Sequence, residues 1–380
     1  MTPYVLVTGD FVRTGGMDMA NFALASYLGR QGADVHLVAH RAAPELLALP
    51  TVHLHRVPKP AGSYLLGAPL LRRAGRRWAR ALASQGARSV ANGGNWDSPD
   101  TNWVHYVHAA HAPAVAGPLA RRALSRWARR GFLADERRAL ARARMVITNS
   151  DRTRADVVER LGIAPERAHT VYYGTDPSHH RPPTAVERAS ARHALGWHDA
   201  APGFVFVGAL GDRRKGFDTL FAAWERLCAD SEWTGRLVVV GAGHELPEWR
   251  ARAERLGLSG RVCFLGFTSD VRGVLWGCDA LVAPARYEAY GLAVHEAVCC
   301  GLPAIVSENS GVNERLPELR ALQFEAGTDP APLVAAITRW RTAREDSAAR
   351  ALTASARLRA WTWDDMAERI VSLMTREGAR

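Results

Sequence analysis

The sequence predicts an α/β protein of two Rossmann-like domains, each built on a parallel sheet covered by helices on both faces. The main observation is a series that occurs twice. An apolar run, a Gly-rich turn and a helical pattern follow one another at 4–8, 9–16 and 17–31. The same series restarts at 204–207, 208–216 and 217–229, and the 380 residues suffice for two domains.

Further apolar runs of about strand length continue each half. In the first half they lie at 35–39, 89–91, 103–107, 145–148 and 169–172, and in the second at 236–240, 262–265, 280–283 and 304–307. Pro182-Pro183 and the polar run behind it indicate a linker. We therefore expect a first domain at 1–180, a second at 181–360 and a final amphipathic helix at 361–380.

The excess of positive over negative charge is confined to the first half. Residues 1–180 hold 24 Lys and Arg against 13 Asp and Glu, whereas residues 181–380 hold 25 of each. This asymmetry favours an anionic partner for the first half. Within the basic segment 121–130, Leu119, Ala123 and Trp127 recur at intervals of four. Such a helix is typical of contact with an anionic membrane surface, or it buries Trp127 in the domain core.

Several protein classes are not indicated. No apolar stretch reaches the roughly 20 residues of a membrane span, and the start of the chain has no secretory signal pattern. Nucleic-acid binding is not expected, because no recognised module occurs. The five cysteines form no CxxC pair, which predicts buried, reduced thiols in a cytoplasmic protein.

The loop 208–216 combines features of a phosphate site. It follows a strand and opens a helix, it begins and ends with glycine, and it carries Arg213, Arg214 and Lys215 in succession. Glycines allow close backbone approach, while the helix start and the cations offer donors to an anion. The alternative is an exposed basic turn.

A second strand leads to two glutamates eight positions apart. Glu288 falls in the loop and Glu296 about one turn inside a helix that we expect to begin near Tyr290 or Gly291. Two carboxylates at the strand ends can accept hydrogen bonds from sugar or ribose hydroxyls. The glycines at 241 and 243 form only a partial dinucleotide fingerprint, which we interpret as a tight turn.

His105, His108 and His111 recur every third position. Their surroundings read as a strand end, where residues three apart face opposite sides, so no metal site is expected. The chain also lacks a D-x-D motif, a spacing of carboxylates that can hold a divalent metal ion on a diphosphate.

Together these motifs resemble a known family. The stretch 286–306 resembles the E-x7-E region of retaining GT-B glycosyltransferases of the family 4 type (glycosyl transferases group 1), and 207–216 is similar to their G-R-L-x-x-x-K-G diphosphate loop. The resemblance extends over nearly the whole chain and includes Gly15-Gly16, Thr148-Asn149-Ser150, 171–176 and 310–314. Two departures are Ala209, where the family has arginine in a loop one residue shorter, and Tyr290, where it has Phe or Gly.

The resemblance implies roles for individual residues. Arg214, or else Arg213, would replace the missing arginine and bind the donor diphosphate with Lys215. Glu296 would hold the ribose and Glu288 a hydroxyl of the donor sugar, while His108, with His105 as the alternative, would stabilise developing charge. Backbone groups would complete the donor site at Gly15, Gly16, Gly208, Tyr290, Gly291 and Leu292.

The resemblance also implies a fold and an activity. The two domains would face each other across a cleft, with the C-terminal helix crossing back to the first domain. The activity would be retaining, metal-independent and cofactor-free transfer of a hexosyl group, from a UDP-sugar rather than a GDP-sugar, to a glycan, lipid or small-molecule acceptor. Such an enzyme would be cytoplasmic or peripheral on the inner membrane face. The alternatives are a nucleotide-sugar epimerase and a non-enzymatic protein that binds an anionic surface.

Overall fold

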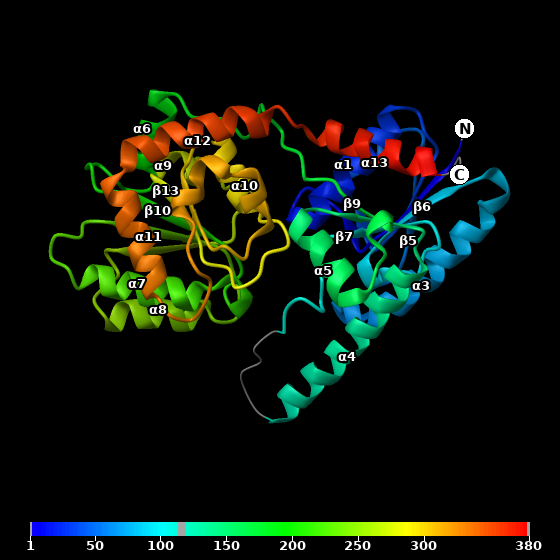
Figure 1. Ribbon diagram of the computed structural model, residues 1–380, viewed down its shortest axis with the longest axis horizontal. Coiled ribbons are helices and arrows are strands. Elements are labelled where there is room, and N and C mark those ends of the chain that lie inside the picture. The colour runs from blue at the N-terminus through cyan, green and yellow to red at the C-terminus, as the bar shows by residue number, and fades with distance from the viewer. Residues whose placement is uncertain (1, 113–118, 378–380) are drawn as a thin grey trace. The chain divides into compact units, whose positions relative to one another are not determined.

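The structure is a computed structural model that describes residues 2–112 and 119–377 (Figure 1). The chain divides into two compact units: Met1–Gly174 with Thr362–Arg380, and Thr175–Trp361. Each unit contains a parallel sheet with helices around it, as the sequence predicts. No helix within the described ranges is long and apolar enough to cross a membrane.

The first unit has a seven-stranded parallel sheet in the order β5-β3-β1-β6-β7-β8-β9. Its strands are β1 Tyr4–Val7, β3 Val35–Ala39, β5 Val52–Arg56, β6 Arg88–Asn92, β7 Thr101–Val104, β8 Met145–Thr148 and β9 Ala168–Thr170. The middle strands consist almost wholly of buried residues, because helices cover both faces. The strand order reverses between β1 and β6, the position where parallel α/β sheets bind ligands.

The helices of the first unit are α1 Gly16–Arg30, α2 Pro44–Leu47, α3 Tyr64–Ala81, α4 Leu119–Arg142, α5 Asp151–Leu161 and α13 Trp363–Glu377. The C-terminal helix α13 packs on α1, where Arg30 and Asp364 form an ion pair of 2.5 Å. Gly174 permits this packing, since a Cβ atom there would lie 2.2 Å from the carbonyl oxygen of Thr362.

The second unit repeats the plan with five parallel strands in the order β12-β11-β10-β13-β14. They are β10 Gly203–Val207, β11 Arg236–Val240, β12 Val262–Gly266, β13 Ala280–Ala283 and β14 Ala304–Val306. The helices are α6 Ala185–Ala194, α7 Phe217–Cys228, α8 Leu246–Arg255, α9 Arg272–Gly277, α10 Leu292–Cys299, α11 Ala331–Thr342 and α12 Arg344–Arg359. Here the order reverses between β10 and β13.

Some predicted elements differ from the structure. The strand expected at 103–107 is β7 at Thr101–Val104, so both His105 and His108 lie beyond it. The turn expected at 9–16 contains β2, Asp10–Phe11, which pairs with β4, Arg41–Ala42. The prediction of buried cysteines is wrong for Cys263, which is exposed on edge strand β12, and Cys228 is only partly buried.

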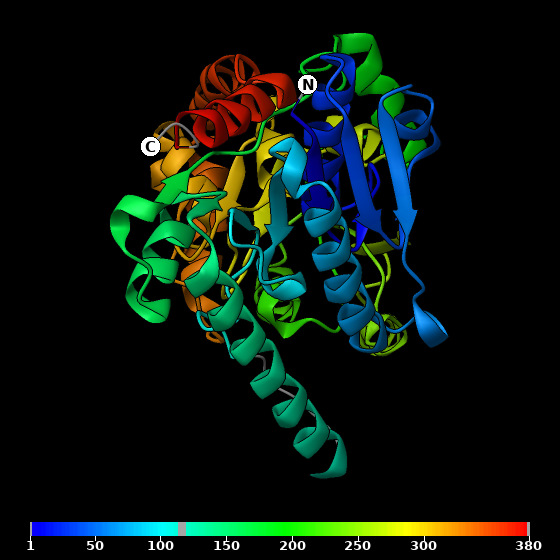
Figure 2. The same ribbon diagram turned by 90° about the vertical axis from the view of Figure 1, so that its right-hand side faces the viewer.

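The basic helix α4 packs on the sheet only through its carboxyl-terminal half, where Ala139 and Leu140 are buried. Figure 2 shows its other half extending away from the sheet. Trp127 lies in that part and is 70% exposed, so the alternative that buries it in the domain core is wrong. The side chains of Leu119, Arg121 and Arg122 lie outside the described set.

Candidate functional site

The polar residues of the second unit gather after β10 and β13, the two strands at which the sheet order reverses. The loops that follow these strands are packed backbone to backbone. The N–H of Arg286 donates to the carbonyl of Arg214 at 2.8 Å. Gly216 has a φ of 71°, and a Cβ atom there would lie 1.9 Å from the carbonyl oxygen of Pro284. Only glycine fits this position, which explains the end of the predicted phosphate loop.

This packing brings two cations and one carboxylate together. Lys215 Nζ lies 2.5 Å from Glu288 Oε2, and Arg214 Nη1 lies 3.4 Å from the same oxygen. Burial acts to raise the pKa of Glu288, but the charges of Lys215 and Arg214 outweigh it and hold that pKa below its ordinary value. Glu288 is therefore ionised and acts as the counter-ion of both cations.

The two arginines of the loop point to different partners. Arg213 lies 3.3 Å from Glu245 and 3.6 Å from Asp218. Arg214 instead joins Lys215 at Glu288 and also donates to the carbonyl of Tyr287 at 3.1 Å. Arg214 thus shares the Glu288 carboxylate with Lys215, whereas Arg213 pairs with two other carboxylates.

Gly208 is approached by the next strand. A Cβ atom at Gly241 would lie 1.9 Å from the carbonyl oxygen of Gly208. The glycines at 241 and 243 therefore serve close packing of the turn after β11 against this loop. A dinucleotide fingerprint is not needed to explain them.

Helix α10 begins at Leu292, after Gly291 with a φ of 108°, which is slightly later than predicted. The N–H of Val294 donates to the carbonyl of Gly291 at 3.0 Å. The N–H groups of Leu292 and Ala293 stand before it, in the part of a first turn that has no acceptor four residues back within the helix. The side chain of Tyr290 turns inward, with its hydroxyl 2.7 Å from Nδ1 of buried His295. The ring of Tyr290 is thus buried in the core, and α10 still begins directly after Gly291.

Glu296, one turn into α10, is in a different electrostatic state from Glu288. Burial raises the pKa of its carboxyl group to about 7. Nε2 of His180 lies 3.9 Å from Oε1 of Glu296. Burial lowers the pKa of His180 to about 4, so that imidazole is uncharged at neutral pH. Among the described residues, no cation pairs with the carboxyl group of Glu296, which can accept hydrogen bonds from a ligand.

In the first unit, Gly15 and Gly16 stand at the start of α1, after β1. Asp18 follows in the first turn, and burial, reinforced by the charge of Asp10, raises its pKa to about 7. Asn92 ends β6 and is 5% exposed, and neither its amide nitrogen nor its amide oxygen has a hydrogen-bond partner among the described atoms. The hydroxyl of Thr8, at the end of β1, is in the same condition.

His108 is held by its backbone. Its N–H donates to Oε1 of Glu136 at 2.8 Å, and the N–H of Ala109 donates to Oε2 at 3.2 Å. The imidazole stacks on Phe132 with ring centroids 5.3 Å apart. Burial, with Arg129 nearby, lowers the pKa of His108, so the ring is neutral and available as an acceptor or donor.

His105 has a structural position instead. Its Nδ1 lies 2.5 Å from the hydroxyl of Tyr173, and burial lowers its pKa to about 3. Over the described ranges, no group of three His, Cys, Asp or Glu side chains is arranged to hold a metal ion.

Two family models match successive parts of the chain. The glycosyltransferase family 4 model matches residues 14–179, and the glycosyl transferases group 1 model matches residues 201–342. Together the two matches extend over most of the chain, which belongs to the glycosyltransferases that these family 4 and group 1 models describe. Among relatives, the D-inositol 3-phosphate glycosyltransferase of Xylanimonas cellulosilytica is 27% identical over 332 residues, which span 80% of this chain and 77% of the relative. Others of that name are matched over about half of their own length.

Solved structures share the GT-B fold. Sucrose-phosphate synthase from Thermosynechococcus elongatus superposes with a TM-score of 0.79 at 21% identity and covers 100% of both chains. The HepE protein of Anabaena, in complex with UDP-glucose, gives 0.73 at 17% identity over 99% of this chain and 100% of that one. At these identities the likeness establishes the fold alone.

Three polar residues of this glycosyltransferase are not predicted from the sequence: Asp18, Asn92 and Glu136. Asn92 carries a recognisable signal, because it is a polar residue that ends an apolar strand. Glu136 is 1% exposed and is an acidic residue on the buried side of an otherwise basic helix. Nothing in the sequence marks the raised pKa of Asp18, which depends on the fold around it.

Replacing Glu136 with alanine is expected to release the His108 segment. The backbone amides of His108 and Ala109 lose their acceptors, so their hydrogen exchange should accelerate at least about tenfold, as expected for loss of a bond to a charged group. Peptide-level exchange by mass spectrometry measures this. The control is Asp135→Ala, because Asp135 pairs instead with Arg72 and Arg138. Equal exchange in both variants would contradict the anchoring role of Glu136.

Glu296→Gln is expected to stabilise the protein at alkaline pH. The folded-state pKa of about 7 exceeds the ordinary value of 4.5, so ionisation opposes folding increasingly as the pH rises from 4.5 to 7. The full penalty, present above pH 7, is at most about 3 kcal/mol by the equivalence of pKa shift and free energy. Denaturant unfolding at pH 5 and pH 8 tests this, with exposed Glu308→Gln as control. A gain at pH 5 as large as at pH 8 would contradict it.

Proposed function

We propose that this protein transfers a hexosyl group from a nucleoside diphosphate sugar to an acceptor hydroxyl with retention of configuration. The observation that carries the proposal is the cluster of Arg214, Lys215 and Glu288 at the switch point of the second sheet, beside the start of α10. Cations, free helix N–H groups and carboxylates are the groups that a diphosphate joined to two sugars requires.

Donor binding would exchange ion pairs. The diphosphate takes the positions of the Glu288 oxygens at Lys215 and Arg214, and the N–H groups near Gly291 and Leu292 complete its coordination. Glu288, released from the cations, accepts a hydroxyl of the donor sugar, and Glu296 accepts the ribose hydroxyls. Each charged contact to the diphosphate contributes about 2–4 kcal/mol in the transition state, by analogy with oxyanion donors.

The transfer step needs no protein nucleophile. The bond between the sugar and the diphosphate breaks, the acceptor oxygen attacks from the same face, and its proton passes to the departing phosphate oxygen. Arg214 and Lys215 stabilise the charge that develops on the leaving group. His108, neutral by its lowered pKa, offers a hydrogen bond to the sugar rather than a charge.

We propose that no metal or cofactor takes part, because two fixed cations can serve the diphosphate in place of a divalent ion. UDP is favoured over GDP because HepE, which shares the fold, is solved in complex with UDP-glucose. The carboxyl ends of β1 and β6 carry polar side chains that can form hydrogen bonds with the hydroxyl groups of an acceptor. These are Asp18, Asn92 and Thr8. These groups suit an acceptor rich in hydroxyls, as in glycan, glycolipid or natural-product synthesis.

Two alternatives differ in what they require. A nucleotide-sugar epimerase of the same architecture would change the donor sugar with no acceptor present. A non-enzymatic protein that binds anionic surfaces would have no use for nucleotide. The intact group of Lys215, Glu288 and Glu296 favours the transferase over the surface-binding protein, and product analysis of the donor alone distinguishes it from the epimerase.

Calorimetric titration with UDP and GDP, with and without EDTA, tests the donor site. We expect UDP to bind with EDTA present. Lys215→Ala should weaken UDP about tenfold, the lower end for a charge-assisted bond, because the free enzyme already satisfies Lys215 through Glu288. Glu288→Gln should bind UDP more tightly than wild type, since it frees both cations, yet should lose transfer activity.

The matched control is Arg226→Ala, which removes an exposed cation from the last turn of α7, the helix that follows the Lys215 loop. Its UDP affinity should equal that of wild type. Loss of UDP binding on addition of EDTA would contradict metal independence. Weaker UDP binding by Glu288→Gln would contradict the counter-ion role of Glu288.

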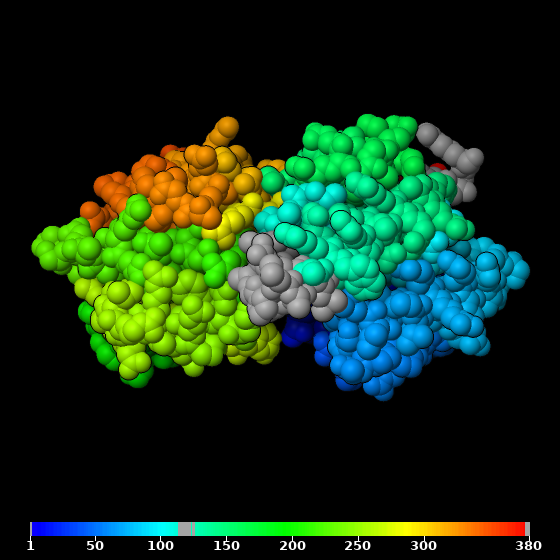
Figure 3. All heavy atoms as spheres, turned by 90° about the horizontal axis from the view of Figure 1, so that it is seen from below, coloured from blue at the N-terminus to red at the C-terminus, as the bar shows by residue number. Residues whose placement is uncertain are grey.

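We further propose that the first unit contacts an anionic membrane surface peripherally. Leu65, Leu66 and Leu70 at the start of α3 are 52%, 55% and 39% exposed, and Arg73 and Arg77 continue the same exposed side of that helix. Figure 3 shows α3 and α4 on one face of this unit. Exposed leucines next to arginines fit the boundary between acyl chains and anionic head groups.

Sedimentation with lipid vesicles measures this contact. Vesicles containing anionic phosphatidylglycerol should bind the protein, and neutral phosphatidylcholine vesicles should not. Leu66→Ser with Leu70→Ser should reduce binding several-fold. The control is Val186→Ser, which removes an even more exposed apolar side chain from the second unit. Equal binding to both kinds of vesicle would contradict the role of the arginines.

A further inference from the structure

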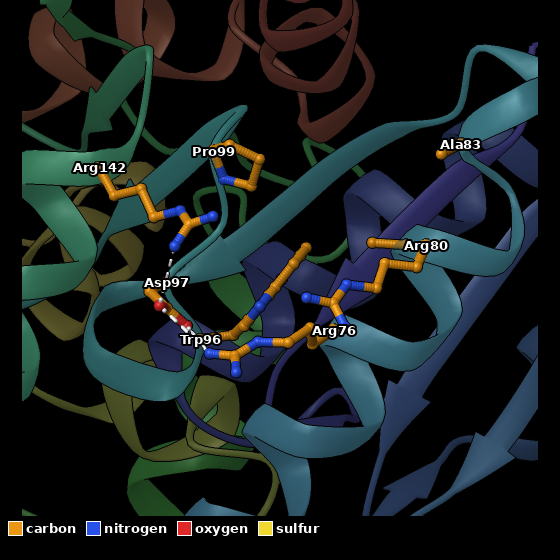
Figure 4. Close-up of a pocket in the computed structure, with 8 residues that line it drawn as sticks. Arg76, Arg80, Ala83, Trp96, Asp97, Pro99 and Arg142 are labelled. Atoms are coloured by element: carbon orange, nitrogen blue, oxygen red, sulfur yellow. Dashed lines mark hydrogen bonds and ion pairs between the residues drawn. The ribbon is translucent and has the colours of Figure 1, made fainter.

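The first unit contains a cavity of about 310 Å³ between α3, the end of α4 and the segment that joins β6 to β7 (Figure 4). Arg76 and Arg80 of α3, Arg142 of α4, and Trp96, Asp97 and Pro99 of the joining segment line it. Its volume lies at the lower end of the range for small-molecule pockets, about 300–1,000 Å³.

The cavity lies toward the amino ends of the strands. Pro99 immediately precedes β7, and its carbonyl accepts from the N–H of Arg144, next to β8. Arg142 ends α4, just before β8, and Arg80 is in the last turn of α3, which leads to β6. Gly15 and His108, by contrast, follow the carboxyl ends of β1 and β7. The cavity is thus at the opposite edge of the sheet from the predicted transfer site.

The lining has an excess of positive charge. Asp97 is 7% exposed. Its carboxylate oxygens form ion pairs with Nη2 of Arg76 at 3.1 Å and with Nη1 of Arg142 at 3.6 Å. Burial acts to raise the pKa of Asp97. The hydrogen bond from Arg76, together with weaker effects, outweighs burial and holds that pKa below its ordinary value. One carboxylate therefore balances one of three guanidinium groups. The guanidinium group of Arg80 has no hydrogen bond or ion pair with any described residue.

A flat apolar surface lies between these charges. Trp96 is buried, and its ring is fixed against α3, where a Cβ atom at Gly75 would lie 3.3 Å from Cδ2 of the indole. Figure 4 shows Arg76, Arg80 and Arg142 extending toward Trp96 and Asp97 from different sides. Unused guanidinium N–H groups beside an indole face suit an anion that carries an apolar or planar body.

We propose that this cavity binds a small organic phosphate monoester, separately from the sugar-transfer site. The phosphate group meets Arg80 and the N–H groups of Arg76 and Arg142 that Asp97 leaves free, and its two negative charges match the excess of two positive charges. The organic part of the ligand packs on the indole of Trp96. Guanidinium groups are the side chains best shaped for such bidentate contact with phosphate.

Calorimetric titration with phenyl phosphate tests this site, because the probe combines the anion with a planar apolar body. The full-length protein should bind it more tightly than it binds inorganic phosphate. Arg80→Gln should weaken phenyl phosphate about tenfold or more. Arg73→Gln, which removes an exposed cation of the same helix that does not line the cavity, should leave the affinity unchanged.

Asp97→Asn gives a result that misfolding could not imitate. It adds one net positive charge and frees Arg76 and Arg142, so phenyl phosphate should bind several-fold more tightly. Lys215→Ala should leave this binding intact, which separates the cavity from the donor site. If Arg80 serves only the end of α3, Arg80→Gln will lower Tm without changing the affinity. That result, or unaltered binding in Asp97→Asn, overturns the proposal.

Discussion

The approach of Gly216 to the carbonyl of Pro284 is the constraint on which the site of the second unit depends. No side chain fits between these backbones, so the loops after β10 and β13 pack directly on each other. One loop carries Arg214 and Lys215, and the other carries Glu288. The ion pairs between them follow from the packing, because a wider separation of the loops would leave a buried carboxylate without a counter-ion.

Two glutamates eight residues apart acquire opposite properties from this arrangement. Glu288 faces two cations and is held ionised, whereas Glu296 faces a neutral imidazole and has a pKa of about 7. A pair of like groups with divergent pKa values is typical of a site in which each has its own partner. The first unit holds uncharged polar groups instead: the side chains of Asn92 and Thr8 are buried and have unused hydrogen-bonding capacity.

Sequence alone predicts the two parallel sheets well, because strands buried on both faces are continuous apolar runs. It also places Lys215 and Glu288 in loops that follow strands. It cannot choose between Arg213 and Arg214, since that choice depends on where Glu245 lies. The length of β7 and the anchoring of His108 by Glu136 also escape sequence reasoning, because residues far apart in the chain determine both.

The pairing of Glu288 with Lys215 also affects which ligands can bind, because a ligand must displace the carboxylate to reach the cation. An anion that takes the place of the Glu288 carboxylate leaves that carboxylate without its cations. This is unfavourable unless the same molecule also donates a hydroxyl hydrogen bond to Glu288. Inorganic phosphate brings no sugar hydroxyl, and a sugar without phosphate brings no anion to take the place of the carboxylate at the cations. We therefore expect a nucleoside diphosphate sugar to bind more tightly than inorganic phosphate or a free sugar, because it satisfies both the cations and Glu288.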